Sequence, residues 1–119
     1  MEVSTQKTGN VQHIRVTGRI DHDTATALES ALQPFVDGAA DGAPLLLDMA
    51  GVRFLTSAGL RVLMIAAKTC RHQQRPIALA CLQPMIAEIV RIARFDLIIP
   101  VYPSVDAALA AISPQTAAR

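Results

Sequence analysis

The sequence LLLDMAGVRFLTSAGL, residues 45–60, decides the fold and contains the candidate site. Its first part continues an apolar run, Ala43–Leu47, that is followed by an acid, Asp48, and we expect this run to be a strand. Because every position is apolar, the strand is predicted to be covered on both faces, as in the middle of a parallel sheet. Apolar spacing predicts a helix over Leu60–Arg71. The residues Leu55–Gly59 are then the loop that leads from strand to helix.

This loop places a small hydroxyl residue, Ser57, at the mouth of a helix. The first N–H groups of a helix lack internal partners, and the helix dipole adds partial positive charge there. A phosphate on Ser57 would therefore be stabilised, and Gly59 is expected to keep the turn small and open. The alternative is that Ser57 is a simple N-cap, which alone would stabilise the helix by about 1 kcal/mol.

The rest of the chain predicts an α/β fold. Strands and helices alternate after an N-terminal hairpin, which favours right-handed crossovers and a mostly parallel or mixed sheet of about five strands with about four helices. One domain over residues 1–112 and a frayed tail over 113–119 are expected. The predicted elements are strands at Glu2–Thr8, Val11–Val16 (ended by Gly18), Ile77–Cys81 and Asp96–Val101, and helices after Asp23 or Thr24, from Pro84, and over Val105–Ile112, with an exit loop over 37–42.

Charge is distributed unevenly although the net charge is only +1. Six acids and no Lys or Arg occur between Asp21 and Asp48, whereas seven basic residues and one acid occur between Arg53 and Arg94. This pattern is typical of solvated helix faces, and it would also suit a surface that meets an acidic partner. Nucleic acid is not an expected partner, because basic residues do not alternate with aromatic ones.

No catalytic, metal or cofactor motif is present. The three histidines, His13, His22 and His72, are far apart in sequence and lack a nucleophile signature, so neither an enzyme nor a bound cofactor or metal is expected. Cys70 and Cys81 form no CxxC pair and are expected to be inert core thiols in a reducing cytoplasm. No apolar run approaches the roughly 20 residues that span a bilayer, so membrane insertion is not expected.

The predicted helix over Leu60–Arg71 has two faces. Leu60, Leu63, Met64 and Ala67 recur at the spacing of a buried face, and Arg61, Lys68 and His72 fall opposite. Ile65 falls among these polar residues. It either packs against a neighbouring helix or is an exposed apolar anchor for a partner.

A second loop, Asp21–Asp23, follows the second predicted strand. Because the sheet is expected to be parallel, this loop should lie at the same edge as Ser57. Together the two loops and the start of the helix predict one docking surface, made of Asp21, His22, Asp23, Thr56, Ser57, Ala58, Gly59, Arg61 and Ile65.

Three motifs resemble one family over nearly the whole chain. Residues 16–25, VTGRIDHDTA, are similar to the "GELD…TA" entry to the first helix of STAS domains, residues 46–60 to the family's "vvlDlsgv.fiDSsGl" signature, and residues 98–108 to its ending. The chain thus resembles the STAS family, in particular the stand-alone bacterial anti-sigma factor antagonists.

The resemblance implies a partner-switching protein. In such systems the unphosphorylated antagonist binds an anti-sigma factor or switch kinase, the kinase phosphorylates the motif serine, and a serine phosphatase restores it. Ser57 falls on that serine. Thr56 stands where many relatives have an acid, and it is the second candidate acceptor. The alternative that the resemblance leaves open is a STAS subunit of a lipid-transport ABC complex that is not regulated by phosphorylation.

Overall fold

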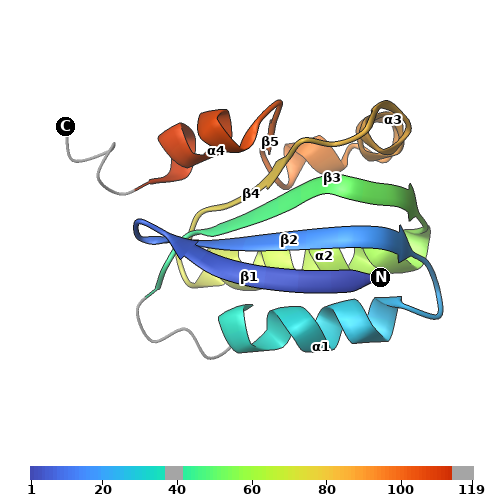
Figure 1. Cartoon of the computed structure of the whole chain (residues 1–119), viewed down its shortest axis with the longest axis horizontal. Coiled ribbons are helices and arrows are strands. Elements are labelled where there is room, and N and C mark those ends of the chain that lie inside the picture. The colour runs from blue at the N-terminus through green and yellow to red at the C-terminus, as the bar shows by residue number, and fades with distance from the viewer. Residues whose placement is uncertain (37–41, 114–119) are drawn as a thin grey trace.

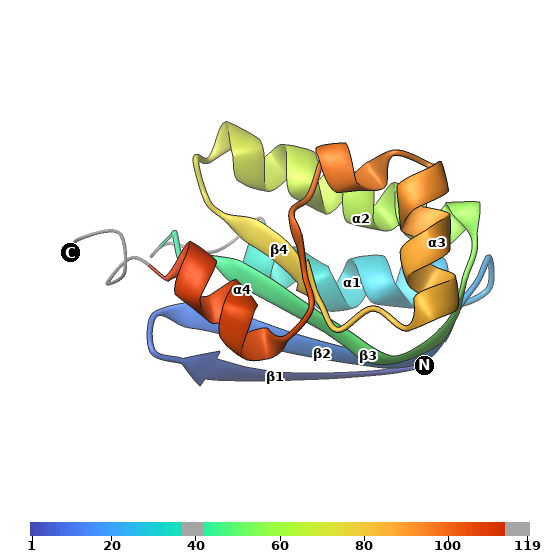
Figure 2. The same ribbon diagram turned by 90° about the horizontal axis from the view of Figure 1, so that it is seen from above.

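The computed structural model describes residues 1–36 and 42–113. Within these residues the chain forms five strands, four α-helices and one short 3₁₀ helix (Figures 1 and 2). In chain order they are β1 (Glu2–Thr8), β2 (Val11–Ile20), α1 (Ala25–Val36), β3 (Leu45–Leu55), α2 (Ser57–His72), β4 (Ile77–Ala80), α3 (Pro84–Ile92), η1 (Phe95–Leu97), β5 (Val101–Tyr102) and α4 (Val105–Ile112).

The strands form a single mixed sheet in the order β1-β2-β3-β4-β5. β1 pairs antiparallel with β2 through the Gly9–Asn10 turn, and the later strand pairs are parallel. Gly9 has a φ of 62°, a left-handed conformation that glycine adopts without steric penalty. The predicted α/β fold with an N-terminal hairpin is confirmed.

The first half of β3 is the centre of the core. Its residues Leu45–Met49 are buried, and for Leu45–Leu47 this is what the apolar run Ala43–Leu47 predicts. Figure 1 shows α1 and α2 beneath the sheet and α4 above it. Leu45 and Leu47 belong to the larger cluster beneath, which also contains Leu28 of α1 and Leu63 of α2. Leu46 belongs to the smaller cluster under α4.

Two strands are longer than the sequence predicts. β2 passes through Gly18 to Ile20, and β3 continues beyond Leu47 to Leu55. Both extensions contain polar residues and glycine, which weaken the strand signal. The β2–β3 ladder absorbs them through register shifts between Arg15 and Thr17 and between Gly18 and Arg19.

The predicted strand over Asp96–Val101 is wrong. Phe95–Leu97 forms the 3₁₀ helix η1, and only Val101–Tyr102 pairs with β4. Arg94 precedes η1 with a φ of 58°, which turns the chain sharply. Phe95 and Ile99 are buried in the larger cluster, so their apolar character reflects a turn packed on the core.

Two predictions fall wholly or partly outside the described residues: the exit loop, of which 37–41 are not described, and the tail, of which 114–119 are not described. The predicted division into a domain over 1–112 and a tail therefore stays a prediction. Among the residues that are described, no helix is long and apolar enough to cross a membrane.

Candidate functional site

The stretch Leu55–Gly59 is not a loop. β3 ends at Leu55, α2 begins at Ser57, and Thr56 is the one residue between them. The Thr56 N–H donates to the Ile20 carbonyl at 3.0 Å, and its hydroxyl lies 3.4 Å from the same oxygen. These contacts tie the ends of β2 and β3 together and fix the start of α2. The prediction of a helix from Leu60 is therefore three residues too short at this end.

Ser57 is the first residue of α2 and is exposed. The N-cap position belongs to Thr56, whose extended backbone has φ −101° and ψ 175° and whose side chain makes no capping hydrogen bond. The alternative that Ser57 is the N-cap is wrong. The Ser57 hydroxyl makes no capping hydrogen bond, and the residue is exposed at the positive end of the helix dipole.

Gly59 has a packing role that differs from the predicted open turn. It is buried in the first turn of α2. A Cβ atom at this position would lie 2.5 Å from Ile20 Cγ2 and 2.7 Å from Leu55 Cδ1. The absence of a side chain therefore lets the helix start rest directly on the ends of β2 and β3.

Asp21 shapes the neighbouring loop. Its Oδ1 accepts the N–H groups of Asp23 at 3.0 Å and Thr24 at 3.1 Å, and its Oδ2 lies 3.6 Å from Arg19 Nε. The hydrogen bond from the Thr24 backbone, more than any other contact, lowers the pKa of the Asp21 carboxyl. This carboxylate closes the turn into α1, whereas His22 and Asp23 are exposed beside it.

The two loops share one edge of the sheet, as predicted. A groove of about 510 Å³ lies where they meet, between the first turns of α1 and α2. Of the residues predicted to form the docking surface, five line this groove: His22, Ser57, Ala58, Arg61 and Ile65. Asp21, Asp23, Thr56 and Gly59 do not line it. Asp21, Thr56 and Gly59 are engaged in the scaffold beneath, and Asp23 is exposed outside the groove.

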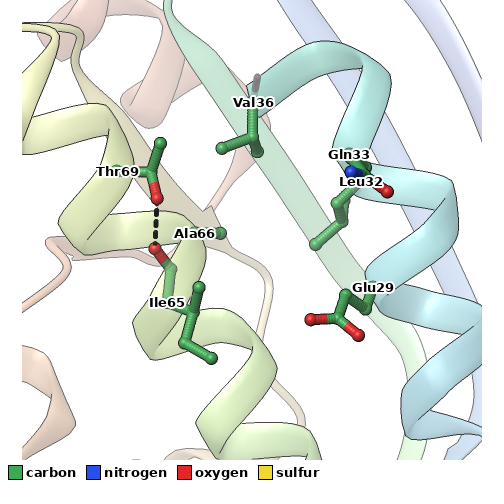
Figure 3. Close-up of a pocket in the computed structure, with 7 residues that line it drawn as sticks. All are labelled: Glu29, Leu32, Gln33, Val36, Ile65, Ala66 and Thr69. Atoms are coloured by element: carbon green, nitrogen blue, oxygen red, sulfur yellow. Dashed lines mark hydrogen bonds between the residues drawn. The ribbon is translucent and has the colours of Figure 1, made fainter.

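Ile65 is exposed, with 45% of its surface accessible. It lies between the groove at Ser57 and a second pocket of about 300 Å³ farther along α1 and α2. Figure 3 shows Ile65, Ala66 and Thr69 of α2 across this pocket from Glu29, Leu32, Gln33 and Val36 of α1. Of the two interpretations of Ile65, the structure therefore supports an accessible side chain over one buried between helices.

The predicted buried face of α2 is partly confirmed. Leu63 and Ala67 are buried, together with Ala66 and Cys70, while Leu60 and Met64 are only half-buried. Leu60 and Met64 line a third groove, of about 540 Å³, between α2 and the segment that follows α3. Ser57, Arg61, Ile65 and Lys68 border the same groove.

Two buried polar contacts were missed by sequence reasoning. Asp48, only 4% exposed, accepts the Ala50 N–H at 3.1 Å, and its Oδ2 lies 3.4 Å from Arg15 Nε and 3.5 Å from His13 Nε2. His13 is 5% exposed. These partners are 33 and 35 positions from Asp48, and only the pairing of β2 with β3 brings them together.

Arg75 forms the second of these buried polar contacts. The sequence counts it among the surface cations, yet it is 6% exposed. Its guanidinium donates to the Ala43 carbonyl at 3.0 and 2.8 Å and to the Val36 carbonyl, at the end of α1, at 3.2 Å. The positive charge of Arg75 therefore stabilises the interior and does not contribute to a binding surface.

The described residues contain no group of three or more His, Cys, Asp or Glu side chains that could hold a metal ion. Both cysteines are free: Cys70 is buried, and Cys81 is half-buried just after β4. Burial raises the pKa of the Cys70 thiol, which favours its unreactive protonated form.

Comparison with known proteins gives consistent matches. The family described as "Mlab, STAS domain" matches residues 3–100. BtrV of Bordetella bronchiseptica, named as an anti-sigma factor antagonist, is 32% identical over 111 residues, which cover 93% of this chain and 94% of BtrV.

Solved structures agree with this. An anti-sigma factor antagonist from Mycobacterium paratuberculosis is 28% identical, with a TM-score of 0.79 and coverage of 93% of this chain and 92% of that one. SpoIIAA of Bacillus in its unphosphorylated form has a TM-score of 0.77 at 12% identity, covering 93% of this chain and 96% of SpoIIAA. At that identity the likeness to SpoIIAA shows the fold alone.

Proposed function

Because this chain belongs to the STAS domain family, we propose that it is an anti-sigma factor antagonist whose partner binding is switched by phosphorylation of Ser57. The proposal follows the two relatives named as antagonists, at 32% and 28% identity, which match the chain over almost its full length. Its partners would be an anti-sigma factor with serine kinase activity and a serine phosphatase, in the cytoplasm.

The accessibility of Ser57 is the observation that carries the proposal. Ser57 is exposed at the rim of two grooves, and no hydrogen bond holds its hydroxyl within the described part of the chain. Thr56 is half-buried, and its hydroxyl is directed to the Ile20 carbonyl. A kinase active site can therefore reach Ser57 with less local opening than Thr56, which ranks Ser57 as the acceptor.

The modification is a phosphoryl transfer performed by the partner. The Ser57 hydroxyl attacks the γ-phosphorus of ATP, its proton passes to a base of the kinase, and ADP leaves. The product would have about −1.5 to −2 charges at neutral pH. In this reaction Ser57 is the group that is modified, and the catalytic base belongs to the kinase.

The phosphate is expected to change binding and not folding. At the first position of α2 it would lie near free backbone N–H groups and the positive end of the dipole, where anions are stabilised by about 0.3–1 kcal/mol. In the bound complex the same charge would be desolvated against the partner. A coupling of about 1–3 kcal/mol between modification and binding would weaken affinity roughly 5–150-fold.

The test is phosphorylation by the anti-sigma factor kinase encoded in the same genome. The protein is incubated with that kinase and ATP, and phosphopeptides are mapped by mass spectrometry. We expect one phosphate on Ser57, loss of the modification in Ser57→Ala, and its retention in Thr56→Val. Phosphate that persists in Ser57→Ala and disappears in Thr56→Val would transfer the acceptor role to Thr56.

The alternative, a STAS subunit of a lipid-transport ABC complex, predicts a different result. In that case the chain would copurify with an ABC-type ATPase, and Ser57 would remain unmodified in cells and in the kinase assay.

A further inference from the structure

The cations of this protein differ in whether they have partners. Arg15 and Arg19 lie near carboxylates, Arg71 and Arg75 donate to backbone carbonyls, and Arg91 pairs with Glu88. Arg61 and Lys68 of α2 form no hydrogen bond or ion pair within residues 1–36 and 42–113. Their charges are therefore available to an external group.

Arg61 and Lys68 both border the third groove, between α2 and the segment after α3. Arg53 and Arg94, whose side chains likewise form no hydrogen bond or ion pair among the described residues, do not line it. Six apolar residues line this groove: Leu60, Met64, Ile65, Ala93, Phe95 and Ile98. Arg61 and Lys68 supply its charged side chains, and Ser57 lies at its end. An apolar floor with a cationic border is complementary to a segment that has acidic and apolar residues together.

The side of Ile65 that faces α1 contains an acidic residue. Glu29 lines both the groove at Ser57 and the second pocket between α1 and α2, and it makes no ion pair among the described residues. Arg61 borders the groove at Ser57 as well, whereas Lys68 borders only the third groove. A segment lying over Ile65 would thus have its acids toward Lys68 and Arg61 and a basic or neutral side toward Glu29. The contrast between Lys68 on one side of Ile65 and Glu29 on the other favours one orientation of the bound segment.

Arg61 also stands in a particular relation to Ser57. It is four residues later in the same helix, so the two side chains are about 6 Å apart along the axis and on one face. An anion four residues before a cation is the favourable order for a helical ion pair. Lys68 is eleven residues from Ser57, about 16 Å along the axis, and is too distant for such a pair.

We propose that the groove between α2 and η1 binds an acidic amphipathic segment of the partner through Arg61 and Lys68, and that phosphate on Ser57 pairs with Arg61 and withdraws it from that segment. This inference rests on the proposed function, because it assumes modification of Ser57. Release of the partner would then have two causes. The phosphate repels the partner's acidic residues, and it pairs with Arg61, which would otherwise bind one of those residues. Arg61 is then a specificity-determining residue of the switch.

The intrahelical pair can be tested without a partner. Phosphoserine is incorporated at position 57 during translation, and the second ionisation of the phosphate is followed by ³¹P NMR. The charged or titratable groups lining the two grooves at Ser57 are His22, Glu29, Arg61 and Lys68. The titration is therefore made in a His22→Gln background, so that no imidazole changes charge in the groove.

Arg61→Gln is expected to raise the pKa of the phosphate by about 0.3 pH units, the shift that corresponds to an exposed helical ion pair. Lys68→Gln removes the same charge farther along the helix and is expected to leave this pKa unchanged. Equal shifts in both variants would mean that only net charge matters, and no shift in either would mean that the pair does not form. Both results overturn the role of Arg61 as the ion-pair partner of the phosphate.

The partner arm uses the unphosphorylated protein and the anti-sigma factor kinase. Arg61→Gln and Lys68→Gln are each expected to weaken binding about 2–5-fold, with a smaller effect at high salt. Unchanged affinity in both variants would remove the acidic segment from this groove. Binding to phosphatidylserine vesicles that Arg61→Gln abolishes would reassign the groove to a membrane surface and overturn the proposal. If the kinase does not bind the wild type at all, the proposed function fails, and the NMR titration still decides the Ser57–Arg61 pair.

Discussion

Replacement of Gly59 by alanine tests how the start of α2 rests on the sheet. The added Cβ atom would approach Ile20 Cγ2 to 2.5 Å and Leu55 Cδ1 to 2.7 Å, and both side chains are buried. Overpacking of this kind destabilises a core by about 1–3 kcal/mol. Alanine would also gain up to about 1 kcal/mol of helix propensity. Because the clash involves two confined side chains, we expect a net loss of about 1–2 kcal/mol in the free energy of unfolding.

The assay is urea denaturation of wild type and Gly59→Ala at equal protein concentration. The midpoint should fall while the dependence on urea stays unchanged, since the same surface is exposed on unfolding. Ala58→Gly is the neighbouring control, and its loss should stem from backbone propensity alone, about 0.5–1 kcal/mol. An increase in stability of Gly59→Ala by about 1 kcal/mol, the propensity gain alone, would refute the close packing of α2 on Ile20 and Leu55.

Three further substitutions probe the scaffold and the docking surface. Arg75→Met should destabilise the protein by about 3 kcal/mol because it removes charged hydrogen bonds to buried carbonyls, whereas exposed Arg53→Met should stay within about 0.5 kcal/mol in the same thermal or urea assay. Asp21 has a lowered pKa, so its carboxylate stabilises the fold above the ordinary value of 3.8 and that contribution is lost as the pH falls through the lower folded-state value. The unfolding free energy of wild type should therefore fall more steeply below pH 3.8 than that of Asp21→Asn, and parallel curves would exclude this role. Ile65→Ser should lower the free energy of unfolding by less than about 1 kcal/mol yet reduce partner affinity. The control Leu63→Ser, in the core, should lower the free energy of unfolding by several kcal/mol. An equally large loss of stability in Ile65→Ser would mean that Ile65 is packed in the interior.

The sequence predicts best where one local pattern dominates. The unbroken apolar run of β3 and the helical spacing of α2 indicate the central strand and its helix, and these two elements determine where Ser57 lies. The ends of β2 and β3 were missed because their continuation depends on pairing with each other, through a ladder with shifted register. The predicted strand at Asp96–Val101 is wrong because Ile98 and Ile99 pack a turn against the core. Such a turn has no periodic pattern that would distinguish it from a strand in the sequence.

The site was predicted in part for the same reason. Ser57, Arg61 and Ile65 share a helix face, and the helical period alone brings them together. The engagement of Asp21 in a turn, the close approach of Gly59 to Ile20 and the burial of Arg75 and Asp48 depend on contacts between distant segments. These residues have polar or small side chains whose role is set by what the fold places opposite them.

The central claim is that phosphate on Ser57 switches partner binding, and the direct measurement is affinity. The anti-sigma factor kinase is titrated by isothermal calorimetry with the unphosphorylated protein and with protein that has phosphoserine at position 57. The dissociation constant is predicted to rise roughly 5–150-fold on phosphorylation, while the melting temperature changes little. Equal affinity of the two forms, measured with both folded, would contradict the switch.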